Sequence, residues 1–393
     1  MPHIIRKPGI LGGTALAVFM ALVHTVNDAI TAILGALLPT LQERFDIGPT
    51  TLAIIVAVFW IASSVTQPIF GALGEDVGLR VIGSLGVLMA AAFLSLIGVA
   101  SELWLVFVLL VIGGLGSAAL HPIGTTIAAS QATNATLGVG LFTAGGMVGF
   151  AAGPVLILYL VSEFGSDATI WLMAPGLLLG GAVALLLPQW EPHPRRPHRR
   201  LFDWRLIRGP VGVLAVASMF SALAFVTFTS SMPLWLVREH GYAPDATLIG
   251  WTLSVFAFAG GLGSVVGGYL APRFGATVTI VGAFLATVVP LAAVVVTEPA
   301  SPLFFAAAAL AGVLIYVPVP ALIIIAQEFA PGAPATASGM LLGLGSALAG
   351  AAYIALGRIQ EAAGLEVGIL IGFAMVIPAA MITLIVLRWP QAA

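Results

Sequence analysis

The chain has 393 residues, a net charge of −2 and no cysteine; 60% of its residues are hydrophobic and only 8% are charged. A soluble domain typically carries about 25% charged residues, so the composition excludes a water-soluble fold and indicates an integral membrane protein. The near-zero net charge argues against nucleic acid as a partner. The absence of cysteine excludes disulfides and thiolate chemistry.

A helix needs about 20 predominantly apolar residues to cross a bilayer, and charged and turn residues divide the chain into twelve such stretches. The first follows a basic N-terminus, but its long apolar run has no small-residue cleavage pattern, so we expect a retained span rather than a signal peptide. The expected spans are 12–40, 51–72, 80–100, 103–128, 137–160, 168–188, 211–236, 247–270, 276–296, 302–327, 336–357 and 365–387.

The loops between these spans divide the basic residues unevenly, which predicts the orientation. With the N-terminus in the cytoplasm, eleven Lys and Arg residues lie inside, and only Arg44, Arg238 and Arg358 lie outside. We therefore expect both termini to be cytoplasmic.

The densest charge run, EPHPRRPHRRLFDWRLIR at 191–208, lies between the sixth and seventh spans. Proline blocks helix continuation there, and arginine is excluded from the hydrocarbon. We expect a cytoplasmic Arg/Pro-rich linker at 191–209, held near anionic lipid by its charge. It joins a six-helix bundle at 1–190 to a second one at 210–393. A specific regulatory site in the linker is the alternative.

The first span contains a polar stripe in the stretch HTVNDAI at 24–30. At about 100° per residue, His24, Asn27, Asp28 and Thr31 fall on one helical face. Of the sixteen acidic residues, Asp28 alone lies well inside a span, and an ionisable side chain at that depth marks a substrate or ion path by default. We predict that Asp28 binds protons and His24 tunes it, with Asn27 and Thr31 on the substrate path. A structural polar network is the alternative.

A loop pattern recurs in the two expected halves. GALGEDVGLR at 71–80 follows the second span and GYLAPRFGAT at 268–277 follows the eighth, an offset of 197 residues (268 − 71). Parallel halves with such a loop resemble the major facilitator superfamily. The superfamily's loop has an acidic and then a basic residue; here Asp76 stands at the basic position and Pro272 at the second acidic position. The expected conformational residues of these loops are Gly71, Glu75, Asp76, Gly78, Arg80, Gly268, Arg273 and Gly275.

In proteins of that superfamily, spans one, four, seven and ten line a central cavity, which implies that His121 of span four faces His24 and Asp28. Ser117 and Thr125 share its helical face and are expected to contact substrate. We predict that His121 takes part in proton coupling or contacts substrate; a hydrogen-bonded core residue is the alternative. Two histidines and one carboxylate on different helices are a weak ligand pattern, so no metal site is predicted. The sequence has no Walker loop or dinucleotide fingerprint, so no cofactor is expected.

The fifth span contains GGMVGFAAGP at 145–154. Gly149, Gly153 and Pro154 resemble the glycine–proline motif of the superfamily's antiporters. Small residues at four-residue spacing let two helices approach closely, and proline permits a bend. This motif can serve tight helix packing alone, or it can form a helix interface that moves during transport.

A closer resemblance covers essentially the whole chain. Four stretches resemble the fosmidomycin-resistance branch of the superfamily: HTVNDAITAILGALLPTLQERF, SSVTQPIFG, ALHPIGTTIA and AQEFAPGAPATASGMLLGLG. That resemblance implies an inner-membrane drug exporter that exchanges its substrate for protons. The branch has a Glu and an Arg after the His-Pro pair, where this chain has Ile123 and Thr126. The resemblance therefore does not extend to the identity of the substrate.

Spans seven and ten offer aromatic and hydroxyl side chains that suit an amphipathic organic molecule. Packing or lipid contact is the alternative for each of them. The residues expected to contact substrate here are Ser221, Phe225, Phe228 and Tyr316.

These features together predict an all-α membrane protein with twelve helices in two pseudo-symmetric halves, which acts as a secondary transporter and not as an enzyme. We expect proton-coupled export of a small organic compound by alternating access, from a monomer in the cytoplasmic membrane. Its expected partners are substrate, protons and the lipid bilayer. Uptake by proton symport or facilitated diffusion is the alternative; a non-transporting receptor or a membrane-embedded enzyme is a remote one.

Overall fold

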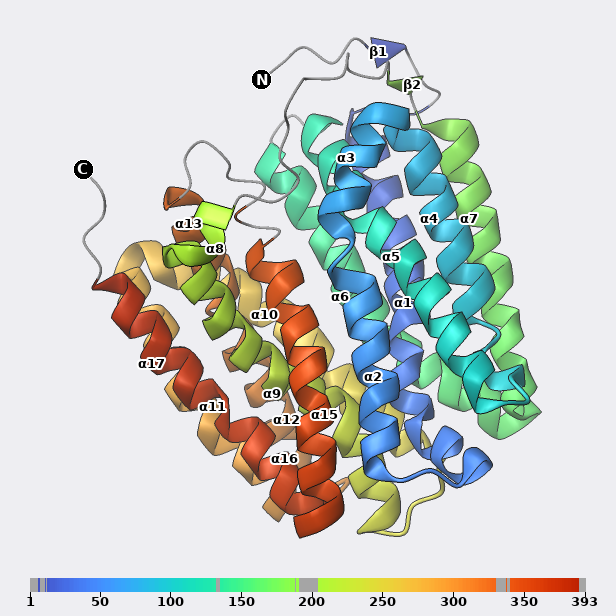
Figure 1. Ribbon diagram of the computed structural model, residues 1–393, viewed down its shortest axis with the longest axis vertical. Coiled ribbons are helices and arrows are strands. Elements are labelled where there is room, and N and C mark those ends of the chain that lie inside the picture. Colours follow the sequence, from blue (N-terminus) through green and yellow to red (C-terminus); the bar gives the residue numbers. More distant parts are fainter. Residues whose placement is uncertain are drawn as a thin grey trace. The chain divides into compact units, whose positions relative to one another are not determined.

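The structure, a computed structural model, describes residues 6–7, 11, 13–131, 135–187, 189–190, 204–329, 337 and 340–388. Nearly all of this backbone is helical (Figure 1). The first part of the chain forms α1 (Gly13–Phe45), α2 (Pro49–Ser64), α3 (Gln67–Val77), α4 (Leu79–Leu94), η1 (Ile97–Val99), α5 (Leu103–Gln131), α6 (Ala135–Phe164), η2 (Ser166–Leu172) and α7 (Met173–Leu186). The second part forms α8 (Trp204–Arg208), α9 (Pro210–Arg238), α10 (Thr247–Phe274), α11 (Ala276–Val296), α12 (Pro302–Tyr316), α13 (Val319–Glu328), the π-helix η3 (Met340–Leu344), α15 (Gly345–Ala363), α16 (Leu365–Ala374) and α17 (Val376–Leu387).

Two short strands complete the described elements. β1 (Arg6–Lys7) pairs antiparallel with β2 (Gln189–Trp190), with Arg6 opposite Trp190. This pair ties the start of the chain to the residues that directly precede the expected linker.

Eleven helical segments in the described ranges, of 21 to 29 residues, are long and apolar enough to cross a membrane. Many of their large hydrophobic side chains are exposed; Leu178, Val265, Val289 and Val296 are each at least 72% exposed. A helix that is apolar on every side must be buried in protein or in lipid. The chain is therefore a multi-pass membrane protein, and the full count of twelve spans stays a prediction.

The expected second span, 51–72, is broken in the structure into α2 and α3. Pro68 at the start of α3 has no N–H to continue the helical ladder. The carbonyl that loses its donor is that of Ser64; just before it, the side chains of Thr66 and Gln67 donate to the carbonyls of Ala62 and Ser63, at 3.1 and 3.0 Å. The break thus has a local cause, and the apolar run continues as two shorter helices.

The chain forms two compact units that do not follow the order of the sequence. The first contains Met1–Ala32, Ala62–Gly153 and Leu160–Phe202, and the second contains Ile33–Ile61, Pro154–Tyr159 and Asp203–Ala393. In the first unit α4 packs on α5 and α7; in the second, α9 packs on α15, α16 and α17, and α10 packs on α12. The expected linker at 191–209 lies outside the described residues up to 203, and the division into 1–190 and 210–393 stays a prediction.

The two copies of the repeated loop share a glycine in an unusual backbone conformation. Gly78 separates α3 from α4 with φ 120° and ψ 127°, and Gly275 separates α10 from α11 with φ 84° and ψ 146°. L-residues rarely adopt positive φ. The repeat found in the sequence therefore recurs as the same turn in each unit.

Ile123 lies in the hydrophobic core of the first unit, together with Leu79, Val87, Leu120 and Phe142. It packs against Gly74 of α3 and Gly83 of α4, where even a methyl group would collide with its side chain. At the position where the resembling branch has an acidic residue, this chain therefore has a packing residue.

Candidate functional site

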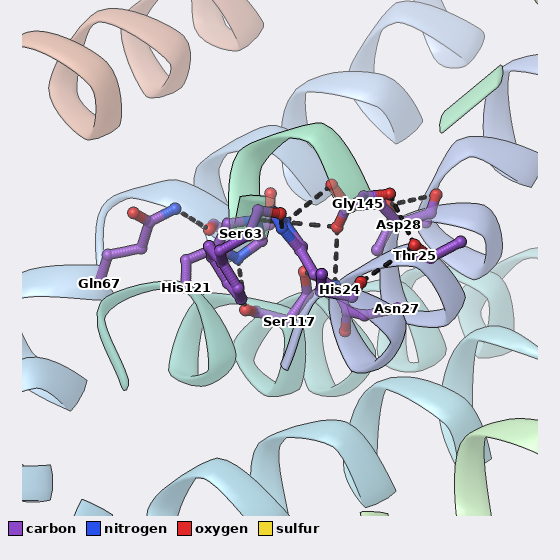
Figure 2. Close-up of polar contacts among 12 residues, drawn as sticks. His24, Thr25, Asn27, Asp28, Ser63, Gln67, Ser117, His121 and Gly145 are labelled. Atoms are coloured by element: carbon purple, nitrogen blue, oxygen red, sulfur yellow. Dashed lines mark hydrogen bonds and ion pairs between the residues drawn. The ribbon is translucent and has the colours of Figure 1, made fainter. Parts of the chain in front are cut away.

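The polar stripe predicted in the first span lies on α1 and meets α5 and α6 inside the first unit (Figure 2). His24 and Asn27 are buried, and the side chain of Asp28 is 14% exposed. The hydroxyl of Thr31 donates to the carbonyl of Asp28 at 3.1 Å. The stripe is thus turned into the protein, as expected for ionisable groups at membrane depth.

His24 is held from two sides. Its Nδ1 lies 2.6 Å from the backbone carbonyl of Phe142 on α6, and its ring stacks on the Phe142 ring at 4.0 Å. Because a carbonyl only accepts, Nδ1 of His24 carries a hydrogen. Its other nitrogen, Nε2, lies 3.1 Å from Oδ2 of Asp28.

His121 on α5 completes the cluster. Its Nδ1 lies 2.8 Å from the carbonyl of Ser117, one turn earlier, so this Nδ1 also carries a hydrogen. Its Nε2 lies 3.3 Å from Nε2 of His24 and 3.7 Å from Oδ1 of Asp28. Two imidazole nitrogens and a carboxylate therefore converge on one point.

Asn27 fixes the carboxylate from the other side. Its Nδ2 donates to Oδ1 of Asp28 at 2.9 Å and to the hydroxyl of Ser117 at 3.1 Å, which ties α1 to α5. Asn27 is only 1% exposed, and its Oδ1 has no hydrogen-bond partner among the described atoms. Because it only donates toward Asp28, Asn27 favours the ionised carboxylate at this position.

The hydrogen bonds of this cluster place electron-rich atoms opposite one another. Each imidazole donates its Nδ1–H to a backbone carbonyl. In a neutral ring the other nitrogen, Nε2, therefore carries a lone pair and no hydrogen. Two such lone pairs and a carboxylate facing one another repel unless a positive charge lies among them. The arrangement is therefore suited to bind a cation. We call His24, Asp28 and His121 the His–Asp–His centre.

Helix α6 covers the His–Asp–His centre with glycine. A methyl group at Gly146 would come within 2.7 Å of both Nε2 of His24 and Oδ2 of Asp28. At the neighbouring residues, the hydroxyl of Thr25 donates to the carbonyl of Gly145 at 2.9 Å. Any larger residue at Gly146 would have to displace the cluster.

The glycines of the fifth expected span continue this contact along α1. Gly149 and Gly153 lie against the backbone of Thr25 and Ala29; a methyl group at Gly149 would come within 2.9 Å of the Ala29 nitrogen. Pro154 follows inside α6. Backbones that approach this closely require glycine, and a moving interface at this contact stays a prediction.

The residues predicted on spans seven and ten belong to the second unit, whereas the His–Asp–His centre belongs to the first. Phe225 forms T-shaped contacts with Tyr316 at 5.7 Å and with Trp60 at 6.1 Å, a contact that the sequence did not indicate. Phe228 is fully buried and stacks on Phe256 at 3.8 Å. Ser221 donates to the carbonyl of Ser218. The side chain of Thr125, also predicted to contact substrate, is outside the described residues.

The predicted loop residues are described in part. The backbones of Gly71, Glu75 and Asp76 lie in α3, but these three residues' side chains are outside the described part of the chain. Nη1 of Arg80 donates to the carbonyl of Leu187 at 3.4 Å, and the guanidinium of Arg273 lies 4.0 Å from the ring centre of Tyr269. A methyl group at Gly268 would meet nothing within 4 Å.

Phe142, Gly146 and Thr25 are parts of the site that the sequence analysis missed. The decisive group of Phe142 is its backbone carbonyl, which has no signature in a sequence. Gly146 belongs to the small-residue stretch of span five, and its place beside Asp28 required knowing which helix packs on α1.

Apolar helices that surround a buried cluster of ionisable side chains define a polytopic membrane protein. The chain matches the family model of the Major Facilitator Superfamily over residues 20–354. It belongs to that superfamily, and it is therefore a membrane transporter.

Two bacterial proteins are similar to it along most of their length. The uncharacterized MFS-type transporter YfnC of Bacillus subtilis is 27% identical over 92% of this chain and 90% of its own. The fosmidomycin resistance protein of Escherichia coli K12 is 25% identical over 91% of this chain and 88% of its own. Among solved structures, the nucleoside transporter NupG superposes with a TM-score of 0.76 at 12% identity, over 95% of this chain and all of the other.

Proposed function

We propose that this protein is a secondary active transporter that exports a small organic compound across the cytoplasmic membrane in exchange for protons, by alternating access. Membership of the superfamily supports transport. The similarity to a protein named for fosmidomycin resistance supports export of a drug-like compound. Proton coupling is supported by the His–Asp–His centre.

The single observation that carries the proposal is the convergence of both Nε2 atoms on Asp28, at 3.1 and 3.7 Å. A proton that binds among these atoms makes one imidazole cationic beside the carboxylate and removes the repulsion between lone pairs. When the proton leaves, the centre keeps an uncompensated negative charge. Moving one charge through 100 mV is worth about 2.3 kcal/mol, which is enough to drive substrate against a gradient.

Competition between the proton and the substrate would couple the two fluxes. A proton that arrives from outside at Asp28 favours release of the substrate, and its loss to the cytoplasm readies the transporter for the next molecule. Ile123 and Thr126 stand where the resembling branch has a Glu and an Arg, so the membrane interior has fewer fixed charges than in that branch. A neutral or cationic compound fits this interior better than a multiply anionic one.

Uptake of a small metabolite is the second candidate function. The fold is shared with a nucleoside transporter, and a centre that binds protons serves symport as well as antiport. Symport carries the proton and the substrate in the same direction and antiport carries them in opposite directions, so the relative direction of the two fluxes distinguishes the candidates.

Reconstituted protein tests both candidates. Compounds are first selected by comparing the sensitivity of cells with and without the protein. The purified protein in liposomes with an imposed pH gradient then reports substrate flux and substrate-evoked proton flux, with a metal chelator present throughout. Export is expected to occur against the inward proton flux, and uptake would occur with it.

Asp28→Asn keeps the shape of the side chain and is expected to abolish pH-driven flux. His240→Ala is the matched control, because His240 lies beside Trp235 in the other unit, and it should keep flux at the unmodified level. Fully pH-driven flux in Asp28→Asn would overturn proton coupling at this residue. No flux of any compound in the panel would count against transport.

A further inference from the structure

The candidate ligand atoms of the His–Asp–His centre lie within 4.8 Å of one another, close to the spacing of a tetrahedral metal site. Adjacent corners of a zinc tetrahedron are about 3.3 Å apart when the metal–ligand bonds are about 2.0–2.1 Å. The two Nε2 atoms are 3.3 Å apart; Nε2 of His24 lies 3.1 Å from Oδ2 of Asp28, and Nε2 of His121 lies 3.7 Å from the other oxygen, Oδ1. The 3.7 Å separation is too long for a hydrogen bond, but it is ordinary for two ligands of one ion.

The groups around these ligands match those that surround metal sites. A metal-ligating histidine almost always donates its other N–H to a carbonyl or a carboxylate, and a ligating carboxylate is itself hydrogen-bonded. Here Nδ1 of His24 donates to Phe142, Nδ1 of His121 donates to Ser117, and Asn27 donates to Asp28. Each ligand therefore already has the outer hydrogen bond that orients its lone pair toward the metal.

The sequence spacing of two of the ligands suits a shared ion. His24 and Asp28 are one turn apart on α1, so their side chains project from the same face. His121 comes from α5 of the same unit, and its ring stands at 90° to that of His24. Atoms of all three residues lie within 4.8 Å of one another. The weak pattern in the sequence thus becomes a set of three converging ligands in the structure.

The centre is partly exposed on the side of His121 and Asp28. The side chain of His121 is 30% exposed and that of Asp28 is 14% exposed, whereas His24 is almost fully covered. Sites with three protein ligands and one open position take water or an external ligand as the fourth. Two neutral imidazoles and one carboxylate leave a divalent ion with a net positive charge, which favours an oxygen donor there.

We propose that the His–Asp–His centre binds one divalent transition-metal ion with the ligand preference of Zn²⁺. Nε2 of His24, Nε2 of His121 and the Asp28 carboxylate are the ligands, and water or an oxygen atom of a transported compound takes the fourth position. Imidazole ligands select zinc-like ions over Mg²⁺ and Ca²⁺, which prefer oxygen. This inference uses the side chains of the proposed proton-coupling centre, so a bound metal ion and a bound proton exclude each other.

Metal binding is tested on the purified full-length protein in detergent, without any transport assay. Titration with Zn²⁺ after removal of metal by a chelator should show one high-affinity site per chain in a calorimeter. Titration with Co²⁺ should give the strong visible absorption of tetrahedral Co²⁺ rather than the weak absorption of the six-coordinate aqueous ion.

Three variants address the ligands and two address the background. His24→Ala and His121→Ala should each abolish the high-affinity site, and Asp28→Asn, which preserves packing, should weaken it at least tenfold. His240→Ala and the pair His193→Ala and His198→Ala remove histidines that are not among the three ligands, and should bind as the unmodified chain does. Thermal unfolding of each metal-free variant identifies any that fails to fold.

The absence of a high-affinity Zn²⁺ site in the unmodified protein would overturn the inference. Unchanged affinity in folded His121→Ala or in Asp28→Asn would do the same, as would a six-coordinate Co²⁺ spectrum. Because the flux assay contains a chelator and the binding assay measures no flux, proton coupling and metal binding can fail independently of each other.

Discussion

Nδ1–H of His24 donates to the backbone carbonyl of Phe142, which lies 118 residues further along the chain, and the two rings stack at 4.0 Å. One bond thereby fixes the tautomer of the imidazole, and one stacking contact fixes its plane. Neither depends on the charge of the ring. The orientation of Nε2 toward Asp28 is therefore built into the packing of α6 on α1.

Gly146→Ala should disturb the His–Asp–His centre while the helices around it stay folded. The added methyl group would lie 2.7 Å from both His24 Nε2 and Asp28 Oδ2, and such overpacking costs about 1–3 kcal/mol. We expect a lower thermal unfolding temperature and loss of pH-driven flux. Gly181→Ala is the control, because a methyl group there meets nothing within 4 Å; equal effects of the two substitutions would contradict the placement of Gly146.

Asn27→Ala should weaken proton-driven flux by about tenfold, the equivalent of one lost hydrogen bond to a charged group at roughly 1.4 kcal/mol. Asp28 would lose its 2.9 Å donor, whereas Ser117→Ala removes only the second acceptor of the same amide group. We therefore expect Ser117→Ala to have a smaller effect. Flux measured in liposomes at a fixed pH gradient compares them, and a larger loss in Ser117→Ala would be inconsistent with this hierarchy.

Gly78→Ala and Gly275→Ala should each destabilise the protein by about 1–3 kcal/mol through the backbone alone. Both glycines have positive φ, and neither has an atom within 4 Å of an added methyl group, so steric collision plays no part. Gly282→Ala, at an equally open position inside α11, should be neutral or slightly stabilising. Thermal unfolding in detergent measures the difference, and the prediction fails if all three variants unfold alike.

Tyr353→Phe should destabilise the second unit by about 1–2 kcal/mol. The buried hydroxyl of Tyr353 lies 2.6 Å from the hydroxyl of Ser231, which also accepts from Gln360 at 2.9 Å. Removing one member leaves a buried polar network incompletely satisfied. Tyr269→Phe, which alters an exposed tyrosine, should leave the unfolding temperature unchanged, and a shift as large as that of Tyr353→Phe would argue against the network.

The sequence was sufficient to predict the features that depend on local pattern. Apolar stretches predicted the membrane helices, and the spacing of His24 and Asp28 predicted that they share a face. Pro68 was visible, yet the break of the second span was not predicted, because a proline also occurs inside continuous helices such as α6. Whether a proline breaks the helix depends on the packing around it, which the sequence does not show.

Features that depend on which helices meet could not be predicted in the same way. The approach of His121 to Asp28 was expected only through resemblance to a family. The carbonyl of Phe142 carries no sequence signal at all. The sequence suggested Phe228 as a substrate contact but not that Phe256 would cover it. Tertiary packing, rather than helical periodicity, determines which polar or aromatic side chain stays accessible.

The two Nδ1–H bonds have a consequence for the path that a proton can take. An imidazole conducts protons when one nitrogen receives a proton while the other gives one away to a different partner. In His24 and His121 the second nitrogen faces a carbonyl that cannot accept a proton onward. A proton that reaches Nε2 of either ring must leave by the same nitrogen. The two imidazoles therefore cannot pass a proton from one nitrogen to the other and onward. Such a site can hold an ion without conducting it across the membrane.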